Sequence, residues 1–209
     1  MTGFMHVDAE TGAQLVAVVV GAFLATLGGY FASRIEEGFR RKDREKTAAL
    51  LFGEIVFALK LILELAERAR GRGDPWGPVT LRLVRAARHE AVTYDRNREA
   101  LFDIADPASR ARTHTLLVQL TMALDGILAA DEELRANDRA LAADNLSAAE
   151  RELLERRQQL CGQDRETSFQ FALELAAGIP GLLDRLRQTA RYSFGKHEEL
   201  VRGGLQGPG

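Results

Sequence analysis

The chain has 209 residues, a formal net charge of -2 and 28% charged residues. Acidic and basic residues are nearly balanced, so no overall charge draws the chain to nucleic acid. The single cysteine, Cys161, excludes an internal disulfide, and zinc sites usually need several Cys or His residues close together. The length fits one domain of ordinary size with a further segment.

Residues 13–33 form the most apolar part of the chain. No charged residue occurs from Thr11 to Ser33, a stretch of 23 residues. As a helix it would be about 34 Å long, and a bilayer core is about 30 Å thick. A cleaved signal peptide or a buried core helix is the alternative. Residues 1–12 hold Asp8 and Glu10 but no basic residue, which disfavours a signal peptide. We therefore expect a transmembrane helix at 13–33.

Basic residues lie only on the C-terminal side of this helix. Residues 1–12 have none, whereas residues 34–46 contain six: Arg34, Arg40, Arg41, Lys42, Arg44 and Lys46. Basic residues near a transmembrane helix stay on the cytoplasmic side. They are therefore the predicted topology determinants, with residues 1–12 outside. The alanine- and arginine-rich composition is typical of a bacterium of high GC content, so we expect a bacterial inner membrane.

Small side chains recur at every fourth position of the predicted transmembrane helix. Residues four apart share a helix face. The positions in this row are Ala13, Ala17, Gly21, Ala25, Gly29 and Ser33. Such a row lets two helices approach closely in lipid. We predict homo-oligomers that pack through Ala17, Gly21, Ala25 and Gly29; the alternative is that this face contacts lipid.

The remainder of the chain predicts a helical cytoplasmic domain over residues 47–194. Residues 47–70 are apolar with interruptions at Glu54, Lys60 and Glu64, which favours a core helix over a second transmembrane helix. Residues 71–78 are rich in Gly and Pro and predict a loop. Trp76 in this loop is expected to fold back onto the domain. Residues 80–105 carry a broken helical pattern.

Two long helices are predicted after this region. Asp106 and Pro107 are typical of a helix start, and the helix should end near Ala136. Its predicted core residues are Leu116, Leu117, Leu120, Leu124, Ile127, Leu128 and Leu134. Residues 140–145 predict a short helical turn. Ser147 and Glu150 match a capping box.

The helix that follows Ser147 carries a repeating apolar stripe. The stripe consists of Leu153, Leu160, Phe171, Leu175, Ile179, Leu182 and Leu186. Gly178 and Pro180 should break this helix, and residues 195–209 predict a disordered tail. Because no segment alternates like a strand, the predicted fold is all-α, with one N-terminal transmembrane helix and a soluble helical bundle.

The sequence contains no recognisable catalytic, cofactor or metal motif. His89-Glu90 lacks the second histidine of a zinc-protease pattern, and no phosphate-binding glycine loop or nucleophile elbow occurs. Cys161 is expected to be a small buried residue. We therefore expect no enzyme, no cofactor and no nucleic-acid partner. The expected function is a membrane-anchored interaction or scaffold protein. The alternative is a membrane effector, of the toxin or phage-defence type, whose assembled anchors perturb the bilayer.

The order of these segments resembles a known kind of protein. An anchor, a basic segment, an apolar helix, residues 94–104 (YDRNREALFDI) and a long helix after Pro107 follow one another. This order is similar to that of uncharacterised bacterial single-pass inner-membrane proteins with a helical cytoplasmic domain. The resemblance covers residues 13–135 and implies no activity or site residue.

Overall fold

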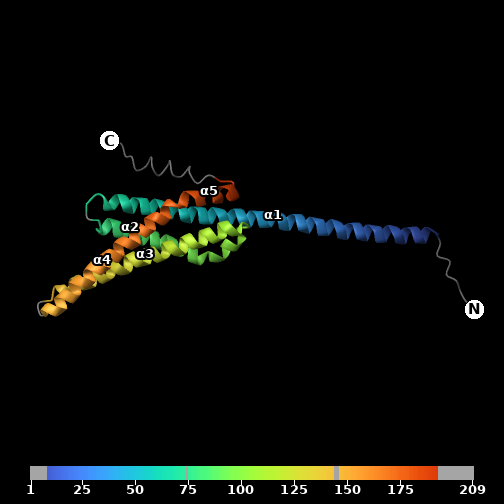
Figure 1. The fold of residues 1–209 in the computed structure, drawn as a ribbon. Coiled ribbons are helices and arrows are strands. Elements are labelled where there is room, and N and C mark those ends of the chain that lie inside the picture. Colours follow the sequence, from blue (N-terminus) through green and yellow to red (C-terminus); the bar gives the residue numbers. More distant parts are fainter. Residues whose placement is uncertain (1–8, 74, 144–145, 193–209) are drawn as a thin grey trace, which may run out of the picture. The chain divides into compact units, whose positions relative to one another are not determined.

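Every regular element of the computed structural model is helical, which confirms the all-α prediction for the residues that it describes. These are residues 9–73, 75–143 and 146–192, with side chains described from Arg34 onward except at residue 35. Figure 1 shows the elements in chain order. The chain divides into two compact units, residues 1–44 and 45–209. The predicted tail, 195–209, lies outside the described residues.

Helix α1 (Ala9–Arg70) is continuous in backbone through the predicted transmembrane segment and into the second unit. Within the second unit, Ala49, Phe52, Val56, Leu59 and Leu63 are fully buried. Their spacing of three and four residues is that of one helix face directed at a core. The predicted core helix at 47–70 is therefore confirmed.

Helix α2 (Pro78–Arg96) and the 3-10 helix η1 (Arg98–Asp103) occupy the region of broken pattern. Tyr94, near the end of α2, is buried; its ring packs edge-on against Phe52, with centroids 6.2 Å apart. Its hydroxyl shares a hydrogen bond with His114 Nδ1. Burial raises the pKa of Tyr94 above its ordinary value. These contacts join α1, α2 and α3 in one core.

Helix α3 (Pro107–Leu141) begins where the sequence predicts and ends later. Five of its predicted core residues, Leu117, Leu120, Leu124, Ile127 and Leu134, are buried, whereas Leu116 and Leu128 are half-buried. Asn137 and Asp138, which follow the predicted end at Ala136, have low helix propensity. In the structure Asn137 is buried, and Asp138 accepts a hydrogen bond from Gln158 of the next helix. Tertiary packing thus extends the helix, and residues 140 and 141 belong to it.

The Asp106 carboxylate caps α3 and makes its stability pH-dependent. It accepts hydrogen bonds from the backbone N–H groups of Ala108 and Ser109 and from the Ser109 hydroxyl. Chiefly because of these bonds from Ser109, its pKa lies below the ordinary value of 3.8. The stabilisation that the Asp106 carboxylate contributes is complete at pH values above its ordinary pKa, and it is lost as the pH falls through the lower folded-state pKa.

We expect Asp106→Asn to lose less thermal stability than wild type on acidification from about pH 6 to about pH 3, because asparagine caps without a titrating charge. Thermal melts at several pH values measure this. Asp106→Ala, which has no acceptor, should melt lower than wild type at neutral pH. Equal acid sensitivity of Asp106→Asn and wild type would contradict the assignment.

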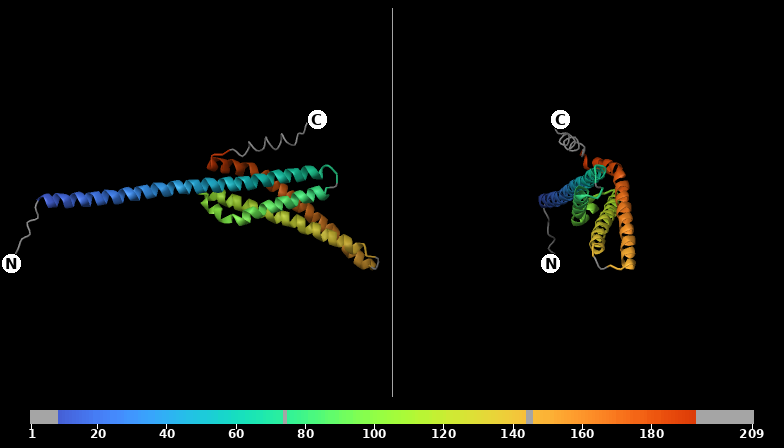
Figure 2. Two further views of the ribbon diagram at one scale, coloured as in Figure 1. Left: turned by 180° about the vertical axis from the view of Figure 1, so that it is seen from behind. Right: turned by 90° about the vertical axis from the view of Figure 1, so that its left-hand side faces the viewer.

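Helices α4 (Ala148–Ala177) and α5 (Ile179–Ala190) complete the domain. The Ser147–Glu150 capping box is present, and the break at Gly178 and Pro180 is confirmed. Figures 1 and 2 show α4 running back alongside α3, and these two helices pack most extensively with each other. The α3–α4 pair therefore forms an antiparallel hairpin.

The predicted apolar stripe on α4 is wrong for its first three residues. Leu153, Leu160 and Phe171 are exposed by 68%, 60% and 40%. The buried face carries a different set: Cys161, Phe169, Ala172 and Ala176. Both sets have helical spacing, so the sequence pattern alone does not distinguish them. The second half of the prediction is confirmed, because Ile179, Leu182 and Leu186 of α5 are buried and Leu175 is half-buried.

Gly126 of α3 marks a close approach to α4. A Cβ atom at this position would lie 2.8 Å from Ser168 Oγ and 3.5 Å from Ser168 Cβ. In a Ser168→Ala background only the ordinary 3.5 Å contact remains. We expect Gly126→Ala in that background to stabilise the domain by about 0.5–1 kcal/mol through helix propensity. In wild type the serine hydroxyl should offset this gain.

A double-mutant cycle measured by urea unfolding tests this prediction. The double variant should be more stable than the sum of the single effects predicts. Strictly additive effects would show that the helices are not tightly apposed at Gly126.

Candidate functional site

Trp76 lies at the centre of a cluster of cations and aromatic rings. Its ring packs edge-on against Phe169 of α4, with centroids 5.5 Å apart. The guanidinium carbons of Arg70, from α1, and Arg165, from α4, lie 4.6 Å and 4.4 Å from its ring centroid. Cation–π attraction of this kind is strongest for tryptophan. Trp76 thus folds back onto the domain, as the sequence predicts.

Both arginines over Trp76 are also held by carboxylates. Arg70 Nη2 donates to both oxygens of Glu166 at 2.7 Å. Arg165 Nη1 donates to Asp131 Oδ1 at 2.9 Å. The other oxygen of Asp131 pairs with Arg135 Nη2 at 3.1 Å. Cation–π contacts thus link Arg70, at the end of α1, and Arg165, on α4, through the Trp76 ring. Ion pairs then link Arg165 to Asp131 of α3, and Asp131 positions Arg135.

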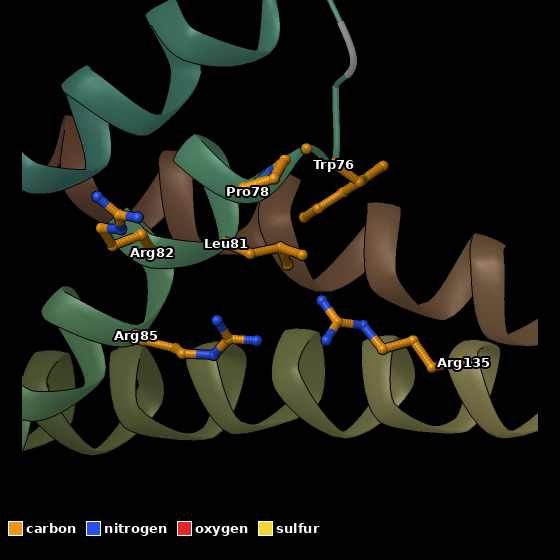
Figure 3. Close-up of a pocket in the computed structure, with 7 residues that line it drawn as sticks. Trp76, Pro78, Leu81, Arg82, Arg85 and Arg135 are labelled. Carbon is orange, nitrogen blue, oxygen red and sulfur yellow. The ribbon is translucent and has the colours of Figure 1, made fainter.

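A groove with a volume of about 390 Å³ opens beside this cluster, between the start of α2 and α3. Its apolar wall is formed by Trp76, Pro78 and Leu81. Three arginines also line it: Arg82, Arg85 and Arg135. Figure 3 shows Arg85 and Arg135 reaching toward each other from facing helices, whereas Arg82, one turn nearer the start of α2, points away from them. No carboxylate lines this groove among the described residues.

The groove continues into a second hollow along α2 and α3. This hollow, with a volume of about 430 Å³, shares Arg85 and Arg135 with the groove and adds Arg139, Asp131 and Glu132. Both Asp131 oxygens are already engaged by arginines. Positive charge therefore dominates the groove, while the second hollow also carries acidic groups.

The residues predicted as sites from the sequence lie elsewhere. Arg40, Arg41, Lys42 and Arg44 are exposed on α1 in the first unit, as is Arg34, and Lys46 is exposed at the start of the second. Arg40 forms an ion pair with Glu36 one turn away, at 2.6 Å. The side chains of Ala17, Gly21, Ala25 and Gly29 lie outside the described residues, although their backbone belongs to α1.

The arginine groove was not predicted from the sequence. Arg82 and Arg85 are three residues apart on α2 and so share a face, a signal that was visible. Arg135 is on another helix, and nothing in the sequence indicates that it meets Arg85. Trp76 was identified only as a residue that packs on the domain.

Cys161 is a buried thiol, as the sequence predicts. Its Sγ donates to Glu133 Oε2 at 3.3 Å. Burial, with the adjacent Glu133 carboxylate, raises the pKa of the thiol above its ordinary value. Because the thiolate is the reactive form, we expect slow labelling by maleimide in the folded protein and complete labelling in denaturant. Cys161→Ser keeps a hydrogen-bond donor and should fold normally.

A cysteine introduced at exposed Gln159 provides the control for this measurement, since it should label at the rate of a free thiol. Equal rates at both positions would show that Cys161 is accessible.

Among the residues described, α3 is the one helix long and apolar enough to cross a membrane. Core helices of soluble proteins meet the same criterion, and α3 packs against α2, α4 and α5. The side chains of residues 13–33 fall outside this description. No three His, Cys, Asp or Glu side chains gather as a metal site in the described part of the chain.

No protein-family model, curated protein or solved structure matches this chain. Its function is therefore argued from its own residues.

Proposed function

We propose that this protein is a membrane-anchored helical interaction protein that self-associates. In this proposal residues 13–33 cross the bacterial inner membrane and the helical domain lies in the cytoplasm. The observation that carries it is the unbroken helix α1, which joins the uncharged segment to the first core helix of the domain. A helix satisfies its own backbone hydrogen bonds, which a segment in lipid requires.

The exposed basic residues after the proposed anchor support the orientation. Arg40, which pairs with Glu36, and Arg41, Lys42 and Arg44 are exposed rather than buried in a protein core, so their charges can meet headgroups and hold this end in the cytoplasm. Glu36, Glu37 and Asp43 are interspersed among them. The acids do not change the orientation, because the rule counts Lys and Arg.

Membrane fractionation and reporter fusions test the anchor and its orientation. The full chain should stay with membranes after alkaline carbonate extraction. Alkaline phosphatase, which is active only outside the cytoplasm, should be inactive when fused to the C-terminus, and a fluorescent protein fused there should fluoresce. Extraction into the soluble fraction would overturn the anchor, and active phosphatase would overturn the orientation.

Cysteine crosslinking in membranes tests self-association through the row of small residues. Single cysteines at Ala17, Gly21, Ala25 and Gly29 are placed in a Cys161→Ser background. Controls at Val18 and Ala22 lie about 100° around the helix. Dimers should form at the first set and much less at the controls. Equal or absent crosslinking at both sets would leave the anchor as a tether only.

A further inference from the structure

The arginine groove brings three arginines together, and no carboxylate among the described residues lines it. Arg82 and Arg85 make no ion pair within the described residues, and Arg135 shares its one carboxylate, Asp131, with Arg165. Arg85 and Arg135 nevertheless reach toward each other across the groove (Figure 3). Convergent guanidinium groups repel each other unless an anion lies between them. The geometry thus favours an anionic ligand.

The start of α2 adds to this positive field. Gly77 and Pro78 line the groove, and Gly77 is the N-cap residue of α2. No side chain caps this helix and its first turn has no acidic residue. Among the residues that the structure describes, no carboxylate in the first turn offsets the positive end of the helix dipole.

The packing of Trp76 disfavours ligands that would stack a nucleobase on its ring. Two guanidinium groups already lie over its ring, and Phe169 packs against it. The ring is therefore engaged within the domain and forms a wall, so a nucleobase stacked on it is disfavoured. The groove instead suits a compact anion with several oxygens, since a guanidinium donates two parallel hydrogen bonds to a phosphate or carboxylate.

The groove lies far from the point where the chain enters the second unit. Within the second unit, α1 runs from Glu45 to Arg70, a length of about 38 Å at 1.5 Å per residue. Arg70 contacts Trp76 in the groove wall. The groove thus lies at the end of this helix segment that is remote from residue 45, where the chain enters the second unit.

We propose that this groove binds a small phosphorylated molecule in solution, with a phosphate held between Arg85 and Arg135 and with Arg82 at the rim. The volume of about 390 Å³ is that of a small-molecule site. The proposal goes beyond the proposed membrane anchoring and does not depend on it.

Isothermal titration calorimetry of the full chain in phosphatidylcholine nanodiscs tests this, with inorganic pyrophosphate as the probe at constant ionic strength. We expect saturable binding by wild type. Arg85→Gln should weaken it about tenfold or more, because Arg85 has no ion pair to lose in the free protein. Arg85→Lys, which keeps the charge but not the planar fork, should weaken it less than Arg85→Gln.

Arg96→Gln is the matched control, because Arg96 is exposed on the same helix and does not line the groove. The affinity of Arg96→Gln for pyrophosphate should stay within about twofold of the wild-type affinity. Absence of pyrophosphate binding, or equal weakening by Arg85→Gln and Arg96→Gln, would overturn the proposal.

Two further titrations separate the sources of the anion. A hexaglutamate peptide that binds as tightly as pyrophosphate, and through Arg85, would replace the phosphate assignment with an acidic peptide. Nanodiscs that contain phosphatidic acid should leave pyrophosphate affinity unchanged. If they suppress it in an Arg85-dependent way, the ligand is a lipid headgroup and the assignment to a soluble molecule is wrong.

Discussion

Replacing Phe169 with alanine should destabilise the helical domain by about 3–5 kcal/mol, the usual cost of deleting a fully buried aromatic side chain. Phe169 is completely buried on α4 and packs against the Trp76 ring. Its ring also lies 4.4 Å from the Arg70 guanidinium carbon. The substitution therefore removes core volume and the support of the Trp76 loop together. Urea unfolding of the full chain in detergent, followed by circular dichroism, measures the loss.

Phe171→Ala is the matched control. Phe171 is two residues further along α4 and is 40% exposed, so its replacement should cost less than about 1 kcal/mol. The sequence pattern alone selects Phe171 as the core residue, and the structure selects Phe169. A larger loss from Phe171→Ala than from Phe169→Ala would show that α4 is rotated relative to the packing described.

Replacing Asp131 with alanine should cost about 3 kcal/mol, because it leaves a largely buried Arg165 without its carboxylate. The Asp131 side chain is 7% exposed and that of Arg165 is 16% exposed. The additional pair with Arg135 contributes little to stability, since Arg135 is mostly exposed. Loss of Asp131 should also free Arg165 from its place over the Trp76 ring.

The single tryptophan gives this second effect its own readout. Trp76 fluorescence of folded Asp131→Ala should shift relative to wild type, whereas exposed Glu132→Ala should change neither fluorescence nor stability appreciably. An Asp131→Leu/Arg165→Leu double variant should be more stable than Asp131→Ala, because no buried charge is left unpaired. Equal stability of Asp131→Ala and wild type would contradict the role assigned to this ion pair.

Helix ends were predictable from the sequence because they depend on local hydrogen bonds. Asp106 with Pro107 starts α3, Ser147 with Glu150 starts α4, and Gly178 with Pro180 separates α4 from α5. A cap involves residues only two or three positions apart, so its signal is contained in a short segment. The end of α3 depends on the burial of Asn137 and on the hydrogen bond from Gln158 of α4 to Asp138, and the end predicted from the sequence was too early.

The amino-acid sequence by itself determined the helical class, the core helix at 47–70 and the inward fold of Trp76. Tertiary structure alone decided which face of α4 is buried, because two apolar sets have helical spacing and only the packing against the other helices selects one of them. The arginine groove likewise forms only in the tertiary structure. Arg85 and Arg135 lie on different helices, and only the packing of α2 against α3 brings their charges together.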